Sequence, residues 1–404
     1  MLLIKKLSYK LSAWSYVVYA GSASFIVALK GFLYAHLLSS AEYALFNYYL
    51  LVLGFGVLAV GSGVIIRCHI ELPLIVENDA KLRPFVEGVK RVGALSWGLL
   101  SVGVIAYSLA VGVTAFIWLP ALIQVIVYFL FTVDLLVTKS RAQFLEYARQ
   151  LFFRNALIAL AGLVGGLVTA KAEWAIMCEA FMGVVLYRKG LYCFIGMFGL
   201  PSWSFVSACM KYVPVTLVGA SIQYADRLLA AYVMPIADFS RFSYLSLCAM
   251  VGLALQQLIN TRVITLLPAV CERDPRQGFL YVLRVSGAVF FVLLPCLSFG
   301  LWILQNPWFS ASWISAGPLL SAFFLLAALF RSSDFFSTYL LVMGKKNSVV
   351  AVQSLTVLLF TCYGLIYAQA GGAPDLTTFM SFVAVGFFAS WLGLVMLSWR
   401  ASLG

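Results

Sequence analysis

Long apolar runs separated by short polar segments make up this sequence, and that pattern constrains the fold more than any motif does. Hydrophobic residues account for 63% of the 404 residues and charged residues for only 10%. A soluble core cannot bury that share of apolar chain, whereas a helix of about 20 apolar residues crosses a bilayer. We therefore expect an all-α polytopic membrane protein. The first run continues too far past Lys10 to be a cleaved signal.

Twelve runs are long enough to cross a bilayer as helices, and the segments between them are brief. In the first half of the chain the predicted spans are 14–36, 43–66, 89–109, 114–137, 151–170 and 172–187. In the second half they are 212–234, 239–260, 281–304, 314–338, 347–369 and 377–399. The pattern predicts twelve transmembrane helices with no inserted soluble domain.

The distribution of lysine and arginine predicts the orientation. If the N-terminus is cytoplasmic, 22 of the 27 basic residues fall in inner segments, while only Lys171 and Arg241 fall in outer ones. Basic residues favour the cytoplasmic side of a membrane, so both termini are predicted to be cytoplasmic, in a bacterial inner membrane. The net charge of +12 is then explained by helix ends facing anionic lipid, and nucleic acid is not an expected partner.

One short motif occurs twice. Ala41–Tyr48 and Ala237–Tyr244 share an alanine, an acid, an aromatic residue, a phenylalanine and a tyrosine at equal spacing. The repeat predicts two homologous halves, 1–190 and 212–404, joined by an interfacial linker at 191–211. Six spans in each half would give both halves the same orientation around a central cavity, an arrangement suited to alternating access.

Charged residues inside the predicted spans are the candidate functional residues, because a charge at the bilayer centre costs roughly 2.5–3.5 kcal/mol and must face protein or water. The cations are interpreted as the lining of a cavity that binds an anionic substrate: Lys30, Arg227 and Arg331. The acids are interpreted as carriers of a coupling ion: Asp226, Glu179 and Asp334. Catalytic residues, a cofactor and a metal site are not expected, since the two histidines and eight cysteines form no ligand cluster and no nucleotide-binding motif occurs.

A structural interpretation of the same charges stays open. Asp226 beside Arg227, and Arg331 one turn from Asp334, are also consistent with charge clusters that tie helices together. Lys30 has no acid three or four positions away, so its partner lies on another helix, or it reaches the interface, or it faces a water-filled cleft.

The repeated motif, together with the segments Lys30–Ala35 and Asp226–Ala230 that precede its two copies, resembles the polysaccharide-transporter branch of the multidrug/oligosaccharidyl-lipid/polysaccharide exporter superfamily. The nearest type is the O-antigen flippase. Both copies depart from the family pattern, which has glycine where Ala44 and Ser240 stand. The resemblance implies translocation of an undecaprenyl-pyrophosphate-linked oligosaccharide, with a polysaccharide polymerase and a chain-length regulator as partners and a proton or sodium gradient as the energy source.

Two other classes of function are open. A small-molecule exporter of the same superfamily, of the ion-coupled multidrug and toxin extrusion (MATE) type, would also have two halves and twelve spans. It would need buried acids without surplus cations. A membrane-embedded polymerase or ligase is the weaker alternative, because such enzymes carry a long periplasmic loop and every predicted outer loop is short. A protein that is not an enzyme is therefore expected.

Overall fold

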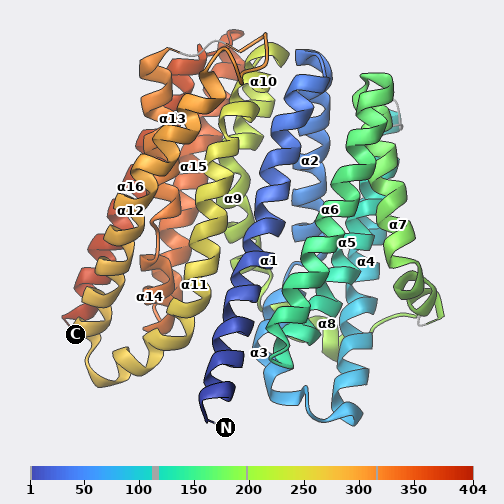
Figure 1. Ribbon diagram of the computed structural model, residues 1–404, viewed down its shortest axis with the longest axis vertical. Coiled ribbons are helices and arrows are strands. Elements are labelled where there is room, and N and C mark those ends of the chain that lie inside the picture. The colour runs from blue at the N-terminus through green and yellow to red at the C-terminus, as the bar shows by residue number, and fades with distance from the viewer. Residues whose placement is uncertain (1, 112–117, 197–198, 315–316, 404) are drawn as a thin grey trace. The chain divides into compact units, whose positions relative to one another are not determined.

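The computed structural model describes residues 2–111, 118–196, 199–314 and 317–403. The predicted spans 114–137 and 314–338, and the linker at 191–211, lie partly outside these ranges. The described residues form sixteen helices and no strand (Figure 1), which confirms the all-α prediction. They divide into two compact units, Met1–Ala220 and Ser221–Gly404. The domain boundaries predicted from the sequence stay a prediction.

The first unit is a bundle built around α6. Its helices are α1 Leu2–Leu37, α2 Ser40–Val60, α3 Val64–Ile75, α4 Asp79–Val111, α5 Trp118–Ser140, α6 Phe144–Thr169, α7 Ala172–Gly196 and α8 Trp203–Met210. Helix α1 packs against α6, α6 packs against α7, and α5 packs against α2 and α7. This packing brings residues of α1 and α7 together although about 150 positions separate them.

The second unit is also helical throughout the elements that the structure describes. It begins within α9 Val213–Val233 and continues with α10 Ile236–Leu245, α11 Leu247–Arg273, α12 Pro275–Gln305, α13 Pro318–Ser332, α14 Phe336–Val342, α15 Lys346–Ala370 and α16 Leu376–Ser402. Helix α13 packs against α11, α12 and α16, and α15 packs against α16. Three residues separate α13 from α14, and this break lies within one apolar segment.

Arg67 holds α8 against α3 and α4 in the first unit. Its guanidinium is paired with Glu71, with Nε 2.7 Å from Oε1, and it donates to the carbonyl of Phe205 at 3.2 Å. It also lies 4.1 Å from the centroid of the Phe205 ring. Gly88 leaves room for that ring, because a Cβ there would be 2.8 Å from it. The described part of the linker is therefore fixed to the first unit.

The two copies of the repeated motif occupy the same local position. Glu42 lies in the first turn of α2 and Asp238 in the first turn of α10. The motif's phenylalanines, Phe46 and Phe242, are both buried, as are the small residues at the position where the family has glycine. These matched positions are packing positions, which gives the motif a structural explanation.

Ten helical segments are long and apolar enough to cross a membrane, among the residues that the structure describes. They correspond to all the predicted spans except the sixth and the seventh. The sixth, α7, carries Glu173, Glu179, Arg188 and Lys189, and the seventh, α9, carries Asp226–Arg227. Charge thus weakens the apolar character of these two helices, and the predicted count of twelve is not confirmed.

The side on which the segment after α7 lies distinguishes ten spans from twelve. With twelve spans and a cytoplasmic N-terminus, Leu200 is cytoplasmic; if α7 and α9 do not cross, it lies on the opposite side. Leu200 is 84% exposed and Trp308 is 90% exposed, so each accepts a cysteine. In a cysteine-free background, we expect a membrane-impermeant maleimide added to intact cells to label Trp308→Cys and to leave Leu200→Cys unlabelled. Labelling of both would contradict the twelve-span topology.

Candidate functional site

A buried ion pair joins α1 to α7 in the first unit. Lys30 Nζ lies 3.0 Å from both carboxylate oxygens of Glu179, and the hydroxyl of Tyr34 donates to Oε1 of the same carboxylate at 3.0 Å. Glu179 is 0% exposed and Lys30 8%. We call Lys30, Tyr34 and Glu179 the Glu179 cluster. Lys30 and Tyr34 are four residues apart and so lie on one face of α1, where both reach the same acid.

The surroundings of the Glu179 cluster hold it in one arrangement. Lys30 Nζ lies 5.4 Å from the centroid of the Phe46 ring, and the rings of Tyr34 and Phe46 are 4.2 Å apart. A Cβ on Gly162 would lie 2.2 Å from the Tyr34 hydroxyl and 2.4 Å from Cγ of Glu179. The absence of a side chain at Gly162 therefore lets α6 approach the cluster closely.

Of the three possibilities that the sequence leaves for Lys30, the structure shows a partner on another helix. The positive charge of Lys30 is therefore compensated by the carboxylate of Glu179. The role of Lys30 in binding an anionic substrate, and that of Glu179 in carrying a coupling ion, stay predictions.

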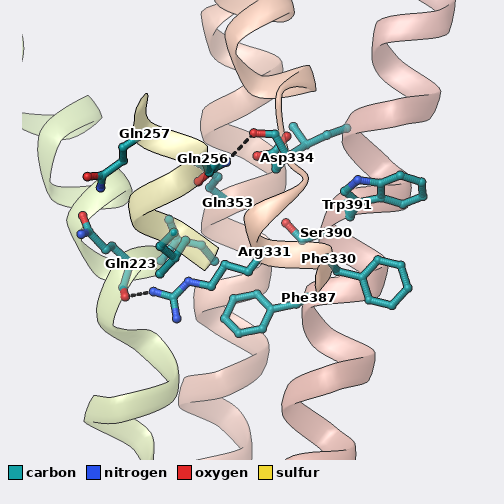
Figure 2. Close-up of a pocket in the computed structure, with 13 residues that line it drawn as sticks. Gln223, Gln256, Gln257, Phe330, Arg331, Asp334, Gln353, Phe387, Ser390 and Trp391 are labelled. Carbon is teal, nitrogen blue, oxygen red and sulfur yellow. Dashed lines mark hydrogen bonds between the residues drawn. The ribbon is translucent and has the colours of Figure 1, made fainter. Parts of the chain in front are cut away.

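A second ion pair lies in the second unit, between α9 and α13. Arg331 Nη1 is 2.9 Å from Oδ2 of Asp226, and the two side chains are 10% and 9% exposed. Arg331 Nη2 also donates to the carbonyl oxygen of Gln223 (Figure 2). The guanidinium lies 5.2 Å from the centroid of the Phe387 ring. Both terminal nitrogens of the guanidinium therefore have an acceptor.

This pairing corrects the local clusters considered from the sequence. Asp226 pairs with Arg331 from a distant helix, not with its neighbour Arg227, and Arg331 does not pair with Asp334. In the part of the chain that the structure describes, Arg227 forms no ion pair, and its buried Nε has no hydrogen-bond partner. The reason is geometric, because adjacent residues on a helix point about 100° apart and cannot face each other.

Asp334 and side chains of neighbouring helices form hydrogen bonds with the backbone where α13 is interrupted. Asp334 Oδ1 accepts hydrogen bonds from the backbone N–H groups of Phe336, at 3.1 Å, and Ser337, at 3.2 Å. The carbonyl of Asp334 accepts from Gln256 Nε2 at 2.6 Å (Figure 2), and the carbonyl of Ser333 accepts from Ser286 at 2.5 Å. Broken helices are tolerated at membrane depth when their freed polar groups are compensated in this way.

The break lines a polar cavity of about 200 Å³, which we call the Asp334 pocket. Figure 2 shows amide side chains from α9, α11 and α15 around it, with Ser390 and Trp391 from α16. Its polar residues are Gln223, Gln256, Gln257, Arg331, Asp334, Gln353 and Ser390. In the described residues, no cation forms an ion pair with the Asp334 carboxylate. The sequence interpretation missed the glutamines, although an amide inside an apolar run was the available signal.

Two further charged residues of the first unit have partners. Asp134 Oδ1 lies 2.7 Å from Lys90 Nζ, and Tyr187 donates to the other carboxylate oxygen of Asp134. Arg154 lies within the apolar helix α6. Its guanidinium is 4.6 Å from the ring centroid of Tyr128. Cation–π stacking of this kind stabilises a cation in apolar surroundings.

The fold of the chain is similar to that of solved transporter structures. It is similar to the inward-facing conformation of a multidrug resistance MATE family transporter of the MOP superfamily, the multidrug/oligosaccharidyl-lipid/polysaccharide exporters, with a TM-score of 0.58. The sequences are 13% identical over 94% of this chain and 95% of that one. The chain therefore has a MATE-like, all-helical membrane fold.

Two further MATE structures give the same result. One is a complex with Br-NRF, with a TM-score of 0.51 and 14% identity over 96% of this chain and 94% of that one. The other is MATE in the straight conformation, with a TM-score of 0.50 and 13% identity over 98% and 95%. No family model matches the sequence, and no curated protein matches it. The likeness concerns the fold alone, and the O-antigen flippase branch stays a prediction.

Substitution of Gly162 tests whether the close packing of the Glu179 cluster contributes to the thermal stability of the protein. We expect Gly162→Ala to lower thermal stability in detergent, because relieving the clash with Tyr34 and Glu179 costs about 1–3 kcal/mol for an overpacked core. Gly21→Ala on α1 is the matched control, since a Cβ there meets no atom within 4 Å, and it should leave stability unchanged or raise it. Equal melting temperatures for the two variants would show that the cluster is not tightly held.

Proposed function

We propose that this protein is an ion-coupled exporter of small organic molecules and that the Asp334 pocket takes the coupling cation. The observation that carries the proposal is the Asp334 carboxylate, which lies at a helix break, lines a polar pocket and has no ion-paired cation among the described residues. An intramembrane acid of this kind is a functional candidate, because a carboxylate in such surroundings can take up a proton or a metal cation.

The two ion pairs narrow the choice among the three candidate acids. Glu179 is compensated by Lys30 and Asp226 by Arg331, so a cation binding either acid would have to displace a buried partner, and stranding a buried charge is costly. The same pairs weaken the argument against a cation-coupled exporter, since two of the three intramembrane cations predicted from the sequence are no longer surplus. Asp334 is the acid that fits the coupling role.

The size and the chemistry of the Asp334 pocket fit a small cation. Its volume of about 200 Å³ is below the roughly 300–1,000 Å³ typical of sites for drug-sized ligands. Carboxylate, amide and hydroxyl oxygens are suitable ligands for a hard cation, and the pocket offers all three. Irregular backbone at a helix break is also a common feature of ion sites in transporters. The pocket therefore suits the ion and not the whole organic substrate.

A second candidate function is translocation of a lipid-linked oligosaccharide. Arg227 favours it, because this cation forms no ion pair in the described residues and has an unsatisfied Nε. A pyrophosphate crossing the membrane needs compensating positive charge, and a guanidinium binds phosphate through paired hydrogen bonds. The resemblance of the repeated motif supports the same function. The two candidates differ in substrate, so transport assays separate them.

The test of the proposed function is gradient-driven efflux of a cationic dye from proteoliposomes that contain the full chain. Asp334→Asn keeps the side-chain oxygen that caps α14 and removes the charge. We expect it to lower efflux driven by a proton or sodium gradient about tenfold or more, because an amide neither exchanges a proton nor binds a cation as a carboxylate does. Purified protein should keep its thermal stability.

Asp375→Asn is the matched control, since Asp375 also caps a helix, accepting from Thr377 N–H at 3.0 Å, but lies outside the Asp334 pocket. It should transport like the unmodified chain. Undiminished coupling in Asp334→Asn would refute the proposed ion site. Absence of dye efflux, together with flipping of a pyrophosphate-linked oligosaccharide that Arg227→Gln weakens, would favour the second candidate.

A further inference from the structure

An apolar groove of about 380 Å³ runs along α4 in the first unit. Leu95, Gly98 and Leu99 of α4 form one wall, Phe194 of α7 and Leu200 of the following segment form the other, and Arg91 lies in the lining as well. The groove is independent of the Glu179 cluster and of the Asp334 pocket, since it shares no residue with either.

The groove continues into an exposed apolar face of α4. Leu99 is 67% exposed, and further along the helix Val102 is 68% and Ile105 is 52% exposed. The space beside Gly98 is open, because a Cβ at that position would meet no atom within 4 Å. Since α4 is one of the candidate membrane-crossing helices, lipid acyl chains are the apolar groups available to fill such a surface.

The charge in the lining is positive. Arg83 and Arg91 share one acid: Arg83 Nε lies 3.4 Å from Glu87 Oε1, and Arg91 Nη2 lies 4.0 Å from Glu87 Oε2. Arg91 is the charged residue of the groove lining, and it shares the Glu87 carboxylate with Arg83, which lies outside that lining. Gly199 of the linker lies beside Arg91, since a Cβ there would be 3.7 Å from the guanidinium carbon, an ordinary contact distance.

We propose that this groove binds one phospholipid with an anionic headgroup. An acyl chain lies along Leu95, Gly98 and Leu99, and the phosphate pairs with Arg91, the contact that guanidinium geometry favours. The charge complementarity selects an anionic lipid over a zwitterionic one. Basic residues between helix ends are common sites for lipid headgroups, and the bound lipid would seal α4 against the segment that follows α7.

Native mass spectrometry of the full chain in detergent tests this proposal by titration with phosphatidylglycerol or phosphatidylcholine. We expect one phosphatidylglycerol to bind about fivefold more tightly than phosphatidylcholine, the factor that corresponds to one basic residue near a headgroup. Arg91→Gln should remove that preference. Glu87→Gln should keep or strengthen it, because it removes the competing acid.

Gly98→Leu and Gly103→Leu form a matched pair on α4, since a Cβ at either glycine meets no atom within 4 Å. Only Gly98 lines the groove, so Gly98→Leu should abolish binding of the lipid while Gly103→Leu leaves it unchanged. Equal affinity of the unmodified chain for the two lipids would overturn the proposal, as would full phosphatidylglycerol binding by Arg91→Gln. Both results can be read even if Gly98→Leu folds poorly.

Discussion

The ion pair between Lys30 and Glu179 is the interaction on which the first unit depends. A single charge at this depth costs roughly 2.5–3.5 kcal/mol, so neither residue can face lipid. Placed 3.0 Å apart, they fix α1 against α7. Tyr34 adds a hydrogen bond to the same carboxylate, and Gly162 lets α6 close over the three side chains. The pair thereby links two helices that both pack against α6.

The second unit also contains a buried ion pair between two helices, and two of its candidate charged residues remain outside that pair. Arg331 compensates Asp226, while Asp334 and Arg227 form no ion pair in the described residues. The two leftover charges carry opposite functional implications. A carboxylate in the Asp334 pocket suits a coupling cation, and a guanidinium with an unsatisfied nitrogen suits an anionic substrate. Transport assays with a cationic dye and with a lipid-linked oligosaccharide distinguish the two functions.

Composition and periodicity predicted the helical membrane fold, because apolar runs of this length have few other solutions. The six charged residues named as candidates were also found from the sequence, since each interrupts an apolar run. Their pairing was not, because Lys30 meets Glu179 149 positions later and Asp226 meets Arg331 105 positions later; such contacts follow from helix packing. The break after Ser332 and its capping by Asp334 were likewise missed, because neighbouring helices compensate the freed polar groups.

Exchange of the two charges of the Glu179 cluster tests the central claim most directly. Lys30→Glu alone and Glu179→Lys alone each place like charges together, and loss of a buried pair costs about 3–5 kcal/mol. Membrane abundance and thermal stability should therefore fall sharply in both single variants. The double variant, with glutamate at position 30 and lysine at position 179, should recover most of the loss. A double variant as unstable as the sum of the two single variants would contradict an account in which this ion pair holds α1 to α7.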